Sequence, residues 1–352
     1  MRNRLTAAGG GCALFALTLA SIALDAQEIP RTPSGRPDLS GTYDTATLTP
    51  LQRPEELGDT LVLTEENAAE IAKEEFERNA TRNAPSDPNR KAPAVGGRVG
   101  GYNRFYIDRG AGAFQIDGHW RTSIIIDPKD GRQPPFTLEG QARADAREAS
   151  RRENTGTAWW LIENGLDATG PYDDPEIRPL AERCLLGFGS VSGPPMLPVL
   201  YNNLKRIVQT DDHVMILAEM VHDARIVRMN AEHAPPEIRG WLGDSVGHWD
   251  GDTLVIDTTN FNDTPALRFA TRNLHVVERF SRIDTHTLRY QFTVEDPTVW
   301  TAPWSGEYVW PASNTRVYEY ACHEANYSFQ GILGGARILE QDVRDGKVDG
   351  SK

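Results

Sequence analysis

Residues 245–258, SVGHWDGDTLVIDT, carry the clearest structural signal in the chain. Two runs of branched and aromatic residues, 245–249 and 253–258, flank the polar tripeptide Asp250-Gly251-Asp252. Asp-Gly is favoured in two-residue hairpin loops because it tolerates the positive φ angles of a type I′ turn. The stretch therefore predicts an antiparallel β-hairpin.

The chain on both sides of this hairpin also favours short strands. Alternating or branched apolar runs are separated by polar turns such as Asp211-Asp212 and Ile283-Asp284-Thr285. Many short strands at even spacing are typical of a barrel or a sandwich. We therefore expect a mainly β fold, with antiparallel neighbours and a few peripheral helices. The further expected strands cover residues 39–47, 102–107, 113–116, 122–126, 205–210, 214–221, 225–229, 275–281, 287–294 and 316–322.

Three segments have the pattern of helices. In residues 64–78, apolar residues recur at helical spacing after Thr64, which is placed to cap the first turn. Residues 137–153 are polar nearly all round, so we expect an exposed helix there. Residues 175–186 begin with a proline directly after Asp174, an arrangement typical of a helix start.

The N-terminus has the features of an export signal. Two arginines precede the apolar run ALFALTLASIA at 13–23, and small residues suited to cleavage follow it. Such a run is too short to span a bilayer core, which needs about 20 residues. We expect a signal peptide over 1–26, no membrane anchor after its cleavage, and a periplasmic or secreted mature protein. The remaining chain, 27–352, is expected to be one β-rich domain with an extended and helical segment over about 27–100.

Charge and cysteine content limit the partners and the compartment. The net charge of −13 argues against nucleic acid and against an anionic membrane surface, because both require a basic footprint. Two cysteines, Cys184 and Cys322, remain after removal of the signal peptide. An oxidising compartment permits a disulfide between them, and two separate buried thiols are the alternative.

Several stretches spread over most of the chain share a recognisable pattern. The longest is GDSVGHWDGDTLVIDTTNF at 243–261, which is followed by LHVVERF at 274–280. The others are PRTPSGRPDLSG at 30–41, RTSIIIDP at 121–128 and YEYACHE at 318–324. Together they resemble a family of secreted proteins common in acidobacteria and proteobacteria. The resemblance implies export and a β-rich domain.

A shorter similarity concerns the type of β fold. Residues 39–43, LSGTY, resemble the first strand of lipocalin-type barrels, where Gly-x-Trp is expected and Tyr43 stands in place of the tryptophan. This similarity favours an antiparallel barrel of the lipocalin or calycin type over a sandwich.

Alternation along residues 274–281 places Glu278 on the apolar face of its strand. Val276 and Phe280 share that face, whereas His275 points to the opposite side. Burying an isolated charge is costly, so a carboxylate in this position must be paired or have a raised pKa.

Ionisable residues on apolar strand faces support a hypothesis of acid–base catalysis. We expect His222 and Glu278 to form the acid–base pair, and an arginine to bind an oxyanion. In the structural alternative, Glu278 pairs with an arginine across the sheet and the histidines lie at solvent-facing strand ends. The candidate catalytic residues are His222, Glu278, Asp257 and His275, and the candidate oxyanion-binding residues are Arg225 and Arg279.

Aromatic residues gather in the C-terminal half of the chain. Trp241, Trp249 and Tyr320 are candidates for substrate binding, because aromatic platforms bind sugars and planar apolar ligands. Residues 300–310, WTAPWSGEYVW, are expected to form a loop that lines a pocket mouth or closes a barrel end.

Three functions remain open from the sequence, which has no P-loop, HExxH motif or paired CxxC motifs. The first is an exported lyase, isomerase or hydrolase that acts on a small, partly apolar or aromatic molecule in a barrel cavity. The second is a non-catalytic, lipocalin-like carrier of a small ligand. The third is a metal-dependent enzyme that uses His222, His275 and His323. Outside that third case, no cofactor is expected.

Overall fold

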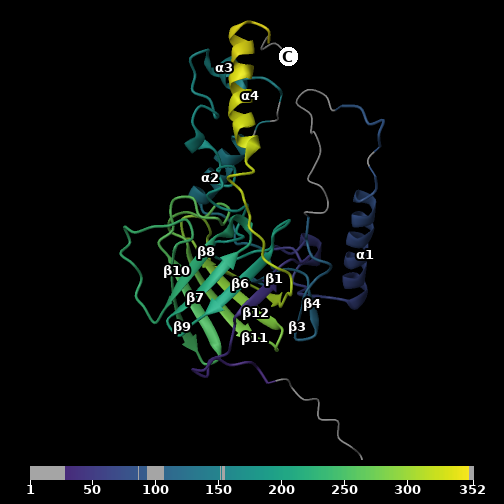
Figure 1. Ribbon diagram of the computed structural model, residues 1–352, viewed down its shortest axis with the longest axis vertical. Coiled ribbons are helices and arrows are strands. Elements are labelled where there is room, and N and C mark those ends of the chain that lie inside the picture. The colour runs from purple at the N-terminus through teal and green to yellow at the C-terminus, as the bar shows by residue number, and fades with distance from the viewer. Residues whose placement is uncertain (1–27, 86, 93–106, 151, 153–154, 349–352) are drawn as a thin grey trace, which may run out of the picture.

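The computed structural model describes residues 28–85, 87–92, 107–150, 152 and 155–348 (Figure 1). It confirms a mainly β fold, in which one ten-stranded sheet is curled into a half-barrel with a few helices around it. In spatial order along the sheet, the strands are β1 (Gly41–Asp44), β6 (Leu204–Gln209), β7 (His213–Ala218), β8 (Ala224–Met229), β9 (Asp244–Asp250), β10 (Thr253–Thr259), β11 (His275–Arg282), β12 (Thr287–Glu295), β13 (Trp304–Pro311) and β5 (Ile125–Asp127).

Smaller elements lie around this sheet. A second, three-stranded antiparallel sheet consists of β2 (Val62–Leu63), β4 (His119–Arg121) and β3 (Gln115–Ile116). The helices are α1 (Glu65–Arg82), α2 (Leu138–Ala149), α3 (Trp159–Asn164) and α4 (Tyr327–Arg344), with 3-10 turns η1 (Glu55–Leu57), η3 (Pro175–Ile177) and η4 (Met220–His222). Figure 1 shows α1 beside the half-barrel, and α3 and α4 together beyond one end of it.

The curl of the sheet brings its first strand against the end of β13. Tyr43 on β1 forms an antiparallel bridge with Ala312. The backbone N–H of Ser313 donates a hydrogen bond to the carbonyl oxygen of Thr42 at 2.8 Å. These bonds satisfy part of the β1 edge, which would otherwise present unpaired backbone groups.

The predicted hairpin is present as β9 and β10, with a different turn type. Asp250 pairs with Thr253, so the two central residues are Gly251 and Asp252. Only Gly251 has a positive φ, of 60°. A glycine at the first central position is the pattern of a type II′ turn, so the expectation of type I′ is wrong.

One strand pair departs from the expected antiparallel order. β8 and β9 run parallel, with Val227 opposite Ser245. Parallel neighbours require a crossover connection, which residues 230–243 supply. His233 and Trp241 both lie in this crossover.

The interior of the half-barrel is a packed aromatic core. The rings of Trp310, Tyr290, Tyr308 and Phe280 are all fully buried and contact one another at tilted or edge-on angles. Trp304, also fully buried, packs edge-on against Phe292. Such rings fill volume that a lipocalin-type ligand would need. The cavities described below therefore lie outside this core.

Residues 300–310 form part of the core, which differs from the expectation from the sequence. The expectation of a loop is wrong, because β13 begins at Trp304 and pairs along its whole length with β12. Trp304, Tyr308 and Trp310 all point inward, and Gly306 between them leaves room for the ring of Phe292.

The helix predictions have mixed outcomes. α1 begins after Thr64, whose hydroxyl accepts a hydrogen bond from the Asn67 N–H, and α2 is mostly exposed as expected. The predicted helix over 175–186 is wrong, since only the turn η3 forms there. Arg178 precedes a proline and adopts an extended conformation, which ends the turn.

The C-terminal region also differs from expectation. Residues 316–322 form no strand, and α4, which the sequence analysis did not predict, follows them. The disulfide between Cys184 and Cys322 is present, with 5.7 Å between the two Cα atoms, and links the region before α4 to the segment after η3. A small apolar cluster around Trp160, Leu161 and Ala336 packs α3 against α4.

Two predictions concern residues outside the described ranges, namely the signal peptide over 1–26 and most of the strand over 102–107. Within the described ranges, every helix is too short or too polar to cross a bilayer.

Candidate functional site

The inner face of the sheet holds a buried ion pair. Glu278 on β11 is fully buried, and both of its carboxylate oxygens accept hydrogen bonds from the guanidinium of Arg225 on β8, with 2.9 Å between Arg225 Nη2 and Glu278 Oε1. The hydroxyl of Tyr290 donates to the same oxygen at 2.8 Å. Glu278 therefore lies on the apolar face, as strand alternation predicts, and its charge is paired across the sheet as in the structural alternative.

His222 lies apart from this pair. Its side chain is exposed, and its Nδ1 is 3.1 Å from the carbonyl oxygen of Tyr320. The strand alternation that suggested an inward position ends at Ala218, and His222 sits in the following turn with a φ of 44°. The predicted contact of His222 with Glu278 is therefore not formed.

On the outer face, two of the predicted catalytic residues meet. Nε2 of His275, the first residue of β11, lies 3.0 Å from Oδ2 of Asp257 on β10. The strand register explains the contact, because Asp257 pairs with Val277 and His275 is two residues away on the same face. Such diagonal neighbours are within reach of long side chains.

Two further residues, which the sequence analysis missed, extend this contact. His233 in the crossover has Nε2 3.0 Å from Asp257 Oδ1 and Nδ1 2.9 Å from Asp244 Oδ2. Asp244 also accepts hydrogen bonds from the Ala234 N–H at 2.9 Å and from Arg228 at 2.8 and 2.9 Å. We call Asp244, His233, Asp257 and His275 the His–Asp chain.

The pKa shifts of Asp244, Asp257 and His275 favour the charged form of each residue. The hydrogen bond from His275 lowers the pKa of Asp257 against the opposing effect of burial, and the same bond raises the pKa of His275. Burial by itself raises the pKa of Asp244, but hydrogen bonds from the Ala234 N–H and His233 hold that pKa below its usual range. Both carboxylates are therefore anionic at neutral pH.

His233 bridges two acceptors. An ionised carboxylate can only accept hydrogen bonds, so the ring satisfies both Asp244 and Asp257 when each of its nitrogens carries a proton. In that form His233 ties the crossover to the outer face of the sheet. It also holds Asp257 in place against His275.

The second ring nitrogen of His275 has a longer contact, to Glu295, whose negative charge adds to the effect of Asp257 in raising the pKa of His275. Its Nδ1 is 3.8 Å from Glu295 Oε2, too far for a normal hydrogen bond, and the side chain is 36% exposed. Because Asp257 accepts the Nε2 hydrogen, the neutral ring keeps its lone pair on Nδ1. The contact with Asp257 therefore orients a partly exposed imidazole, with its basic nitrogen on the side of Glu295.

The remaining predicted residues lie at separate places. Arg279 on the outer face forms an ion pair with Asp250 at 2.7 Å, and the guanidinium of Arg36 lies over the ring of Trp249. Trp241 lines a groove that is described below.

The histidines suggested as metal ligands are not gathered. His222 and His275 have the separate contacts given above, and His323 lies in the turn before α4. Within the described ranges, no three histidine, cysteine or carboxylate side chains are arranged to hold a metal ion together.

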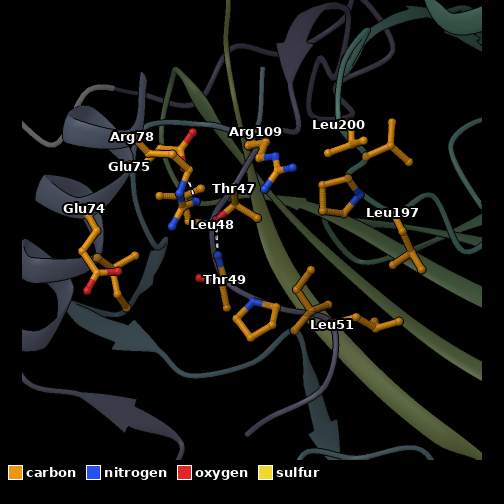
Figure 2. A pocket seen from close by; sticks show the side chains of 15 residues that line it. Thr47, Leu48, Thr49, Leu51, Glu74, Glu75, Arg78, Arg109, Leu197 and Leu200 are labelled. Atoms are coloured by element: carbon orange, nitrogen blue, oxygen red, sulfur yellow. Dashed lines mark hydrogen bonds and ion pairs between the residues drawn. The ribbon is translucent and has the colours of Figure 1, made fainter. Parts of the chain in front are cut away.

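A cavity of about 490 Å³ lies between α1 and the segment that follows β1 (Figure 2). Its wall is mixed, with Leu51 and Leu197 on one side and the charged residues Glu74, Glu75 and Arg78 of α1 on the other. Glu75 forms an ion pair with Arg78 at 2.6 Å. Figure 2 shows Arg109 between these α1 residues and the opposite wall. The Nε of Arg109 is buried and has no hydrogen-bond partner within the described ranges.

The sequence predicts that two members of the His–Asp chain, Asp244 and Asp257, lie close together. Once the hairpin turn at Gly251 sets the register, Asp244 and Asp257 fall on one face of adjoining strands, because Thr259 pairs with Asp244. His233 has no such signal, since it lies in irregular chain.

Comparisons with known protein families, characterised proteins and solved structures found no match to this chain.

Proposed function

We propose that this protein is an exported acid–base enzyme of the secreted family that its sequence resembles, with His275 as the general base. The observation that carries the proposal is the 3.0 Å contact of Asp257 with His275, which orients a partly exposed ring whose Nδ1 has only the longer contact to Glu295. The Cys184–Cys322 disulfide supports a location outside the cytoplasm, in the periplasm or the medium.

The chemistry follows from the roles of the two ring nitrogens. Nδ1 of His275 takes a proton either from the substrate or from a water molecule that attacks the substrate. Asp257 stabilises the imidazolium that forms. The same nitrogen then returns the proton to the product. His233 and Asp244 hold Asp257 in the geometry that this transfer requires.

The position of His275 on the outer face limits how a substrate can reach it. The residue lies on the outer face of the sheet, at the end from which the loop 260–274 projects. A substrate would therefore approach His275 from solvent and not through the packed barrel core. A lyase, an isomerase and a hydrolase would all use the same proton transfer, with a partly apolar molecule or a segment of a larger one as substrate.

The test compares variants on a panel of substrates for these three reaction types. His275→Ala and Asp257→Asn should each lower kcat by about 10²–10⁴-fold, the usual contribution of a positioned base. His248→Gln is the matched control, because His248 is an exposed histidine on the same face. A substrate turned over equally well by the His275→Ala variant would refute the assignment of His275.

The cavity beside α1 favours a second function, the binding of a small amphipathic carboxylic acid. An apolar body would contact the Leu51 and Leu197 side of the cavity, and a carboxylate would accept hydrogen bonds from Arg109. Arg109→Met should weaken the binding of dodecanoate about 10–100-fold, as expected for one lost charged hydrogen bond. Dodecanamide, which lacks the charge, is the control ligand. Equal binding of dodecanoate by the variant and the wild type would contradict this function.

A further inference from the structure

A groove of about 1020 Å³ lies at the end of the sheet where the loop between β10 and β11 projects. Its walls come from α2, from the segment around η3 and from residues 263–270 of that loop. The crossover contributes Trp241. The arginines that line it are Arg143, Arg147, Arg178, Arg183 and Arg268, and we call it the arginine groove.

The charge of this groove is opposite to that of the whole protein. Five arginines line it against two carboxylates, Glu176 and Asp263, whereas the full chain carries a net charge of −13. Asp263 is already paired with Arg272 at 3.0 Å. The groove is therefore a locally basic surface in an acidic protein.

Among the residues that the structure describes, most of these arginines have no acidic partner. Arg178 is the exception and is paired with Glu182 at 2.8 Å. Arg183 donates to the backbone carbonyl of Glu176, and Arg268 lies over the ring of Phe269. Within the described ranges Arg143 and Arg147, one turn apart on the exposed side of α2, form no ion pair at all. Guanidinium groups that line one groove, most of them without an ion-pair partner, favour an anionic ligand.

The groove also offers one aromatic platform. Trp241 is partly exposed in its wall, whereas Phe269 is covered on one side by Arg268 and packs edge-on against Phe136. An aromatic ring stacks well on the C–H face of a sugar. Nucleic acid, by contrast, is bound by a series of aromatic platforms along a longer basic track.

We propose that the arginine groove binds an acidic oligosaccharide, a chain of sugar rings that each carry a carboxylate. Arg143, Arg147 and Arg183 bind the carboxylates through paired N–H donors, and Trp241 stacks on a sugar face. The groove has a volume of about 1020 Å³ and its arginines come from α2, the segment around η3 and the loop 263–270, which suits a chain better than a compact anion. The proposal is independent of His275, because binding here requires no proton transfer.

Titration calorimetry with an oligogalacturonate tests the proposal on the mature protein. Binding should be present, should weaken steeply with added salt, and should be absent for a neutral glucan of the same length. The Arg143→Ala/Arg147→Ala double variant should bind about 10–100-fold more weakly, the loss of one to two charged contacts. Both arginines are exposed, so circular dichroism should show the fold unchanged.

Two control variants and one competing ligand test whether the binding is specific to the arginine groove. Arg316→Ala removes an exposed arginine from a different cavity and should leave the affinity unchanged. His275→Ala should also bind like the wild type, so loss of activity in that variant would not be confused with loss of binding. Undiminished binding by the double variant, or tighter binding of single-stranded DNA with the same number of charges, would overturn the assignment of the ligand.

Discussion

The two faces of β11 carry acid–base groups only three residues apart, yet they differ in almost every physical property. Glu278 points inward, is fully buried and is bonded by Arg225 and Tyr290. His275 points outward, is about one-third exposed, and its second ring nitrogen has only a 3.8 Å contact to Glu295. The difference is that a buried pair fixes structure, whereas a partly exposed pair can exchange protons with a ligand.

The inner pair is sealed by its surroundings. Each oxygen of Glu278 already has a donor, and the residue is fully buried in the core. Burial, followed by the negative charge of Glu278, raises the pKa of Tyr290 well above its usual range. The hydroxyl therefore stays protonated and keeps donating to Glu278.

The largest expected effect comes from breaking the inner pair. Glu278→Ala leaves Arg225 buried without a partner and should lower the free energy of unfolding by about 3–5 kcal/mol. Urea denaturation of the purified variant measures this loss. The double variant Arg225→Met/Glu278→Leu should regain most of it, because it buries no charge. A single variant within 1 kcal/mol of wild type would show that the pair is not structural.

A smaller effect is expected from the outer pair. Asp257→Asn should bring the pKa of His275 back toward its ordinary value, which NMR titration of the ring would measure. The raised pKa of His275 stabilises the fold at pH below its unfolded value, and the lowered pKa of Asp257 does so above its own unfolded value. The stability difference between wild type and variant should therefore be larger near pH 5 than near pH 9. Solvent screening limits it to about 1 kcal/mol or less.

The smallest effect should come from salt, which distinguishes the faces without mutation. At 1 M NaCl the Debye length is about 3 Å, so exposed charges are strongly screened and buried ones are not. The pKa of His275 should fall toward its ordinary value, whereas the cost of Glu278→Ala should stay the same. A pKa of His275 that does not change with salt would indicate that the Asp257–His275 pair is as shielded from solvent as the Arg225–Glu278 pair.

Local sequence rules were sufficient for much of this comparison. Alternation along β11 placed Glu278 and His275 on opposite faces, and the cost of burying a charge required a partner for Glu278. The N-cap at Thr64 and the hairpin at Gly251 also follow from short-range chemistry. These features depend on residues that are close in sequence, so their physics can be evaluated without the fold.

Two of the failed predictions involve residues far apart in the chain. The alternation that predicts an inward position for His222 ends at Ala218, and residues 300–310 complete the core although their composition predicts a loop. In the second case, proline, serine and glycine lower strand propensity. Packing of Trp304 and Trp310 against the other rings of the half-barrel outweighs that preference.

The sequence by itself determined the β-rich class, the strand faces and the need to pair Glu278, because alternation and burial are local and one-dimensional. Only the tertiary structure decided which partner each group obtained. The parallel pairing of β8 with β9 brings the crossover over the outer face, and so places His233 between Asp244 and Asp257. Contacts of that kind depend on chain path and register across long separations, which no local pattern specifies.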